Sequence, residues 1–229
     1  MVTKDVEHLR QFMMMVKEIN TLFRLFQFVD KNFNASKYLW HTNKMYLYAE
    51  EFTDDYALQA LAKKYEATVW QTFYGLSIAE EHIDRLKKHY RKNTSGNSAI
   101  KQNGKKHLEK VTEKDIEQFA SFLFTEIKNG LCLPFNYHDF DQTKKDLDDF
   151  FFILNLFDPL AGNFADQLDL QLLHKLKKLI EKKHELKEQL TAVSRLKKNS
   201  KLIRATEKLT EEEVQLNAEI STASKFFKQ

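Results

Sequence analysis

Apolar residues recur every three or four positions along most of this chain, which is the spacing of one face of an α-helix. The first such stretch predicts a long helix over residues 6–33. Its inner face is predicted to consist of Phe12, Met15, Val16, Ile19, Leu22, Phe23, Phe26 and Val29. Met13, Met14, Leu25 and Phe28 widen the apolar stripe, which predicts a helix surrounded by other helices.

The next helices are predicted from the same spacing and from their start signals. Ser36 is expected to cap a short aromatic helix that ends near Tyr48. Thr53, followed by two aspartates, predicts a new helix that continues to about Tyr90. Gly75 is expected to bend or break this helix.

The middle of the chain combines a segment without periodicity and two further helices. Residues 93–110 collect Asn, Ser, Gly and Lys, which predicts a mobile basic loop. Thr112 with Asp115 is a capping signal for a helix that is expected to end at Gly130. Another helix is predicted over 141–157.

The last part of the chain, residues 166–229, carries leucines in heptad spacing. In its first half the predicted seam positions are Leu172, Leu176, Leu179, Leu186, Leu190 and Val193, with Lys183 and Lys197 at two others. In its second half they are Leu202, Leu209, Leu216, Ile220, Ala223 and Phe227. The two registers are offset, which predicts an antiparallel, coiled-coil-like helical hairpin that turns at Asn199 and Ser200. A helical bundle over 1–165 is expected to precede it.

The composition agrees with an all-α fold. Only 5 of the 229 residues are glycine and 2 are proline, although loop-rich and β-rich folds need both residue types. Each glycine stands alone, whereas phosphate-binding loops and nucleophile elbows need clustered glycines. We therefore predict an all-α protein, a multi-helix bundle with a C-terminal helical hairpin.

Several features bear on the cellular compartment. No apolar stretch is long enough to predict a membrane span, and the first residues lack the basic and then apolar order of a secretory signal peptide. The single cysteine, Cys132, cannot form an internal disulfide, which favours a reducing compartment. We expect a cytoplasmic protein, or one exported into a host cell without a cleaved signal peptide.

Charge is distributed unevenly around a net value of +3. Residues 85–110 carry a basic excess and residues 111–169 an acidic excess. Blocks of opposite sign attract one another within a folded molecule, and we prefer this interpretation. The alternative is binding to a nucleic acid or an anionic surface, with candidate anion-binding residues Arg85, Lys87, Lys88, Arg91 and Lys92.

Two histidine patterns support an enzyme as the competing hypothesis. His138 next to Asp139 resembles the central pair of the helical HD phosphohydrolases, which implies a metal-dependent phosphohydrolase. Arg85 and His89 resemble the arginine–histidine pair of HEPN ribonucleases, although they lie closer together than in that class. Neither pattern is accompanied by the rest of its family's site.

Two further pairs have spacings that metal ligands on one helix use, Glu181 with His184 and His82 with His89. Both lie among charged residues, where solvated surface side chains are the usual outcome. We therefore predict no catalytic residue, no metal ligand and no cofactor.

The C-terminal residues TEEEVQLNAEISTASKFFKQ combine a glutamate cluster, small hydroxyl residues and an apolar pair. These residues are Glu211, Glu212 and Glu213, then Ser221, Thr222 and Ser224, and finally Phe226 and Phe227. The segment resembles a type IVB secretion signal, by which intracellular Gram-negative pathogens export effectors. The resemblance implies a route of export and no biochemical activity.

The function that these patterns favour is a non-catalytic, all-helical protein-interaction module, exported as a bacterial effector that binds a host protein. Candidate partner-binding residues are the seam leucines Leu186, Leu190, Leu209 and Leu216. A homodimer joined through 166–229 is the alternative use of the same region.

Overall fold

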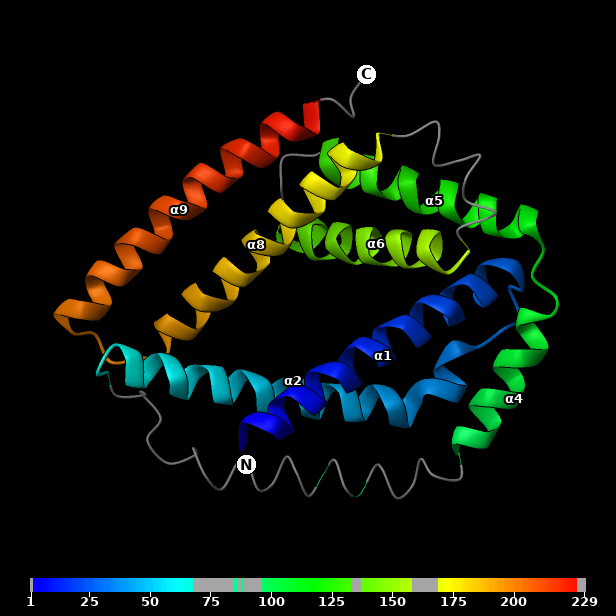
Figure 1. The fold of residues 1–229 in the computed structure, drawn as a ribbon, viewed down its shortest axis with the longest axis horizontal. Helices are drawn as coiled ribbons and strands as arrows, with labels where there is room; N and C mark the ends of the chain where they lie inside the picture. The colour runs from blue at the N-terminus through cyan, green and yellow to red at the C-terminus, as the bar shows by residue number, and fades with distance from the viewer. Residues whose placement is uncertain are drawn as a thin grey trace. The chain divides into compact units, whose positions relative to one another are not determined.

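The computed structural model of the protein describes residues 2–67, 85, 88, 96–132, 137–157 and 169–225. Every regular element there is an α-helix, which confirms the predicted all-α class (Figure 1). The elements are α1 (Val2–Val29), α2 (Ala35–Lys64), α4 (Gly96–Leu108), α5 (Glu113–Cys132), α6 (Tyr137–Leu156), α8 (Leu170–Ser194) and α9 (Ser200–Ser224).

The chain forms two compact units. The N-terminal unit comprises Met1–Val111 and Arg195–Lys197, and the C-terminal unit comprises Thr112–Ser194 and Lys198–Gln229. The boundary predicted after residue 165 lies outside the described residues. Each unit therefore has its own set of packed helices.

The N-terminal unit is built around an aromatic cluster between α1, α2 and α4. The two long helices run antiparallel, and α4 packs on both (Figure 1). The buried members of the cluster are Phe23, Phe26, Phe33 and Leu39. The Phe33 ring centre lies 5.3 Å from that of Phe23 and 5.8 Å from that of Phe26, within the range of favourable ring pairs. These rings fill the space where the three helices meet.

Helix α2 is continuous where the sequence predicted two helices. It begins after Asn34, whose side-chain oxygen accepts the Lys37 N–H at 3.2 Å, so the predicted cap at Ser36 is wrong. Thr53 lies inside the helix and donates its hydroxyl proton to the Glu50 carbonyl at 2.9 Å. The polar atom that suggested a helix start is thus satisfied within the helix.

The predicted continuation of this helix to Tyr90, with the bend at Gly75, lies outside the described residues except at Arg85 and Lys88. The described helix ends at Lys64. Glu66, which follows, has a φ of 50°, in the left-handed region that side chains seldom adopt. This conformation ends the helical path of the chain.

Helix α4 replaces the loop that was predicted over 93–110. Within Gly96–Leu108 the chain is helical, and Ile100 packs against the aromatic cluster. The His107 ring lies 4.5 Å from that of Phe33. Two well-placed side chains hold this helix, because tertiary packing supplies most of the stability of a short helix. The sequence prediction failed because it counted apolar residues and could not weigh the surface that receives them.

The inner face predicted for α1 is also narrower than expected at its N-terminal end. Met14 and Met15 are exposed, although Met15 was assigned to the inner face and Met14 to its widened stripe. Val16, Phe23, Leu25 and Phe26 are buried. Apart from Val6, the buried residues of α1 begin at Val16, and most of them lie in the part of the helix that contributes to the aromatic cluster.

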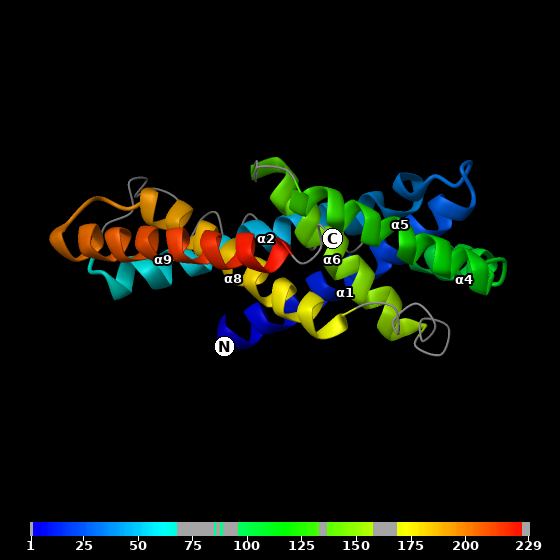
Figure 2. The same ribbon diagram turned by 90° about the horizontal axis from the view of Figure 1, so that it is seen from above.

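The C-terminal unit is a series of packed helices in which α5 packs on α6, α6 on α8 and α8 on α9. Helices α5 and α6 run in opposite directions, as do α8 and α9 (Figures 1 and 2). The fully buried side chains of α5 and α6 include Phe119, Leu123, Ile127, Leu147, Phe150 and Ile153. Their spacing of three and four residues places them on one face of each helix.

The start of α5 confirms the predicted capping signal. The Asp115 carboxylate accepts the Thr112 hydroxyl at 2.6 Å and the Thr112 backbone N–H at 2.9 Å. The hydroxyl bond and then the backbone bond lower the pKa of Asp115 below its usual value. The Asp115 backbone N–H in turn donates to the Thr112 hydroxyl at 3.3 Å, and this reciprocal arrangement is a capping box.

The predicted end of α5 at Gly130 is wrong, because the helix continues to Cys132. A Cβ atom at position 130 would overlap the hydroxyl oxygen of the buried Thr143 side chain of α6. Glycine is therefore present because α6 approaches closely at this point, and not because the helix ends.

Candidate functional site

The α8–α9 pair was the predicted partner-binding region, and its buried seam is now defined. α8 buries Leu173, Leu176, Ile180, Lys183, Leu186 and Val193, and α9 buries Leu202, Leu216, Ile220, Ala223 and Ser224. The positions predicted at Leu172 and Leu179 are only half-buried, and Leu173 and Ile180 replace them. α8 contacts both α6 and α9. Its buried stripe is therefore wider than the seam predicted for contact with one helix, and its centre lies at different residues.

The four candidate partner-binding leucines fall on this inner side. Leu186 and Leu216 are buried, while Leu190 and Leu209 are half-buried. In this arrangement the leucines stabilise the C-terminal unit and present little surface to a partner. A surface for docking must therefore be sought on the other faces of the two helices.

A side of α9 adjacent to the buried one carries a second row of residues at alternating spacings of four and three. We call this row the α9 outer face, and it consists of Ile203, Glu207, Thr210, Val214, Asn217 and Ser221. All six are exposed, with Val214 at 66% and Ile203 at 46% of full exposure. One charged residue in six is few for a solvent-facing helix of a chain that is 30% charged. α9 thus has heptad-like spacing on two sides, of which α8 covers one.

Two threonines of α9 form hydrogen bonds within the helix, which lowers the polarity of the surface that they present to solvent. Thr206 donates to the Leu202 carbonyl at 2.8 Å and Thr210 donates to the Thr206 carbonyl at 2.9 Å. Because each hydroxyl group already donates a hydrogen bond to a backbone carbonyl of the helix, it forms fewer hydrogen bonds with water. The Thr210 methyl group then adds to the apolar surface of Val214 and Ile203.

The start of α9 is fixed by Asn199, whose side-chain oxygen accepts the Leu202 N–H at 2.8 Å. Lys197 precedes this cap, and the predicted turn at Asn199 and Ser200 lies at the N-terminus of the helix. The outer face is therefore presented by a helix that has a defined beginning and whose neighbouring side is buried.

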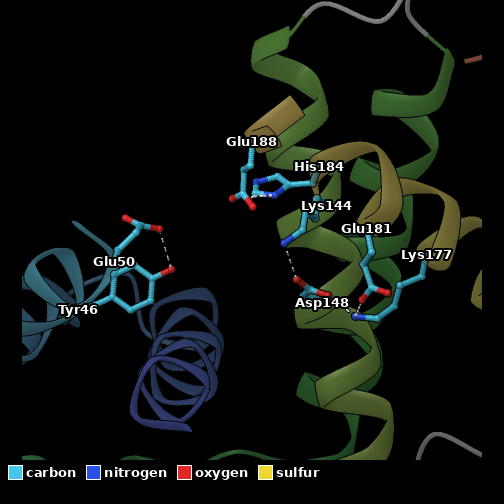
Figure 3. A network of polar contacts seen from close by, with 8 residues as sticks. All are labelled: Tyr46, Glu50, Lys144, Asp148, Lys177, Glu181, His184 and Glu188. Atoms are coloured by element: carbon cyan, nitrogen blue, oxygen red, sulfur yellow. Dashed lines mark hydrogen bonds and ion pairs between the residues drawn. The ribbon is translucent and has the colours of Figure 1, made fainter. Parts of the chain in front are cut away.

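A polar network joins α6 to α8 (Figure 3). Asp148 on α6 lies 3.5 Å from the Lys144 ammonium and forms a further ion pair with Lys177 on α8. Lys177 in turn lies 3.2 Å from Glu181. Burial lowers the pKa of Lys177, but hydrogen bonding to Asp148 and the charges of Asp148 and Glu181 outweigh this effect and raise it. The ion pair between Asp148 and Lys177 thus links α6 to α8.

The structure also places Glu181 and His184, the pair whose spacing would suit metal ligands but for which no metal role was predicted. Glu181 pairs with Lys177, while the His184 Nδ1 atom lies 3.1 Å from Glu188 (Figure 3). Within the described part of the chain, no group of three His, Cys, Asp or Glu side chains could hold a metal ion. The side chains of Cys132, His138 and Asp139, and residues His82 and His89, lie outside the described residues.

Two of the candidate anion-binding residues are described. Arg85 and Lys88 are both exposed, and the Arg85 guanidinium lies 5.7 Å from the ring centre of Tyr48, within cation–π range. Lys87, Arg91 and Lys92 lie outside the described residues. The basic excess continues on α4, where Lys101, Lys105 and Lys106 are exposed.

Comparison of the chain with known protein families, characterised proteins and solved structures found no match. Among the helices that the structure describes, none combines the length and apolar character needed to cross a membrane.

Sequence reasoning missed the α9 outer face because it followed the leucines, the strongest heptad signal. Ile203 and Val214 lie eleven residues apart, which is three helical turns and therefore the same side. Their alignment could have been found from the sequence. Which of the two α9 faces packs on α8 could not, because both have suitable spacing.

Proposed function

We propose that this protein is a non-catalytic interaction module that binds a host protein through the α9 outer face. The observation that carries the proposal is the exposure of Ile203 and Val214 on a row with heptad-like spacing, beside the buried side of the same helix. Such a row suits docking of an amphipathic helix, in which apolar residues at spacings of three and four contact the partner.

We further propose that the protein reaches the host cell by type IVB secretion. The residues that resemble the signal occupy the last turns of α9, from Glu211 to Ser224, apart from Phe226 and Phe227, which lie outside the described residues. Glu211 is exposed and Ser224 is buried. Glu212 and Glu213 are half-buried, so a change in the glutamate cluster should disturb packing less than a change at Ser224.

The binding surface is tested by affinity capture of host proteins with purified wild-type protein and two single variants. Val214→Glu places a charge on the outer face, whereas Gln215→Glu places the same charge on an exposed neighbour outside it. We expect a partner to be retained by wild type and Gln215→Glu and lost with Val214→Glu. Equal retention by both variants would show that the outer face is not the binding surface.

Activity assays separate this proposal from the enzyme hypothesis. Purified protein would be assayed for bound metal and for degradation of RNA and nucleotides, with His138→Ala as the control. An activity that is lost in His138→Ala, or stoichiometric metal, would replace the interaction role with the phosphohydrolase or nuclease alternative.

Export is tested with a translocation reporter fused to the chain and to its Glu211→Ala, Glu212→Ala, Glu213→Ala triple variant. Alanine favours helix, so the variant should keep α9 intact. We expect the triple variant to lose translocation while its expression and helical content stay unchanged. Equal translocation of the two chains would remove the support for this route.

A further inference from the structure

A second apolar surface lies on α2, in the N-terminal unit. Trp40 is 58% exposed and Leu47 is 45% exposed. They are seven residues apart, so they lie on the same side of the helix, two turns from each other. Leu39, Thr42, Met45, Ala49 and Phe52, which α2 buries, lie on its other faces, whereas Leu58, which is also buried, lies on the same side as the apolar pair and closer to the C-terminus. Tryptophan is among the residues most enriched at the energetic centres of protein interfaces.

Charged residues accompany the apolar pair in a defined order along the helix. Lys37 and Lys44 lie towards the N-terminal end, and Glu51 and Asp54 lie towards the C-terminal end. Together with the apolar pair they form the α2 stripe, Lys37, Trp40, Lys44, Leu47, Glu51 and Asp54. Successive members are three, four, three, four and three residues apart, the spacing of a helix seam that pairs with another helix.

The Lys44 ammonium lies 5.1 Å from the centre of the Trp40 ring. This contact places the lysine stem beside the ring and leaves much of the indole exposed. The stripe therefore presents an apolar centre, a basic half and an acidic half, all on one rigid helix.

We propose that the α2 stripe binds the α2 stripe of a second copy of this chain, with the two helices antiparallel about a two-fold axis. A parallel arrangement would place lysines beside lysines and acids beside acids. In the antiparallel arrangement Lys37 faces Asp54 of the second copy, and Lys44 lies beside its Leu47. A two-fold axis repeats every contact, so this register gives two Lys37–Asp54 pairs at the ends of the interface and places each Trp40 beside Glu51 of the other copy.

The proposed interface is small, and this determines how the dimer should behave. Stable interfaces bury about 1,200–2,000 Å² in total, whereas one stripe centred on a tryptophan and a leucine lies at or below the lower end of that range. We therefore expect monomer and dimer to exchange, with the average mass rising between about 1 and 200 µM protein. Because charge pairs contribute, added salt should weaken the association.

Sedimentation velocity of the full chain over this concentration range tests the proposal. Trp40→Ser should lose the dimer, and Lys37→Glu should weaken it by about tenfold or more because like charges then face each other. The double variant Lys37→Glu, Asp54→Lys reverses both ends of the stripe and should restore dimerisation. Glutamate at position 37 is in the third residue of the helix, where it favours the helix start, so this variant should fold.

Val214→Ser is the matched control, because it removes a similarly exposed apolar side chain from α9. It should dimerise as wild type does. The proposal is overturned if wild type stays monomeric at about 200 µM, or if Trp40→Ser dimerises like wild type. It is also overturned if Val214→Ser alone loses the dimer, which would place self-association in the region 166–229. Host-protein capture by the outer face is measured separately, so either proposal can fail without the other.

Discussion

The two units hold their helices together by different contacts. In the N-terminal unit the junction of three helices is filled by a few aromatic rings, and an amide pair, Asn20 to Asn43 at 3.0 Å, links α1 to α2. In the C-terminal unit long rows of mainly aliphatic residues pack between successive helices, and ion pairs on α6 and α8 flank them. The ring contacts of the N-terminal unit thus gather in one cluster, whereas the buried residues of the C-terminal unit, including four phenylalanines, are spread over several helices.

The difference between the units shows that a helix with few apolar residues can be held in place when it packs on a large apolar surface of other helices. Helix α4 is held by Ile100 and His107 because the rings of Phe26 and Phe33 offer a broad surface. By contrast, α9 buries Leu202 near its start and Leu216, Ile220, Ala223 and Ser224 in its last turns, with half-buried residues such as Leu209 between them. Four comparisons of variants test this contrast.

The largest effect is expected from truncating one ring of the aromatic cluster. Phe33→Ala removes contacts with four other rings and should lower the free energy of unfolding by about 3–5 kcal/mol. Leu216→Ala in the long seam should cost about 2–3 kcal/mol. Urea unfolding followed by circular dichroism measures both, with exposed Val214→Ala as the control expected within about 0.5 kcal/mol of wild type. A larger loss for Leu216→Ala would reverse the contrast.

Glycine to alanine substitutions should have opposite signs in the two units. Gly130→Ala introduces a Cβ into the Thr143 side chain and should cost about 1–3 kcal/mol despite better helix propensity. Gly104→Ala meets nothing within 4 Å and should stabilise α4 by up to about 1 kcal/mol. In a Thr143→Ala background the cost of Gly130→Ala should shrink. An unchanged cost there would show that the overlap with Thr143 is not its cause.

Helix caps should behave alike in both units, which tests whether the contrast is confined to the cores. Asn34→Ala and Asn199→Ala each remove a side-chain acceptor from a helix N-terminus and should each cost about 1 kcal/mol. The aspartate variants keep the acceptor and should stay close to wild type. Thermal unfolding of the four proteins measures this, and an effect at only one asparagine would contradict the expected equivalence.

The smallest effects concern two lysines of α8. Lys177→Met breaks a partly exposed ion pair and should cost up to about 1 kcal/mol at pH 7. Lys183 is 8% exposed with its ammonium 4.7 Å from the Phe140 ring centre, and Lys183→Met should be neutral or slightly stabilising. Burial lowers the pKa of Lys183, with Lys187 acting in the same direction and Glu213 against it.

The pH dependence of the two variants should run in opposite directions. The raised pKa of Lys177 means that its contribution is present below about pH 10.5 and is lost as pH rises through the folded-state value. The lowered pKa of Lys183 means that the wild type gains stability relative to Lys183→Met as pH rises towards 10.5. Melting temperatures between pH 7 and 11 measure both trends. Parallel trends for the two variants would show that their environments do not differ as described.

The sequence by itself determined the fold class and much of the second unit. Helical spacing and the scarcity of glycine and proline predicted an all-α chain, and the capping pair Thr112 and Asp115 predicted the start of α5. Most seam positions of α9, including Leu202, Leu216 and Ile220, were also predicted. These signals are local, because they depend on residues within a few turns of one helix.

Only the tertiary structure decided the remaining features, because each depends on a surface contributed by a distant segment. Gly130 is explained by Thr143 on another helix, and α4 by rings of α1 and of the segment that follows it. The exposure of Val214 and Trp40 likewise follows from which face of each helix its neighbours cover. A sequence shows that a helix has two suitable faces, and the packing of the other helices determines which of them remains in solvent.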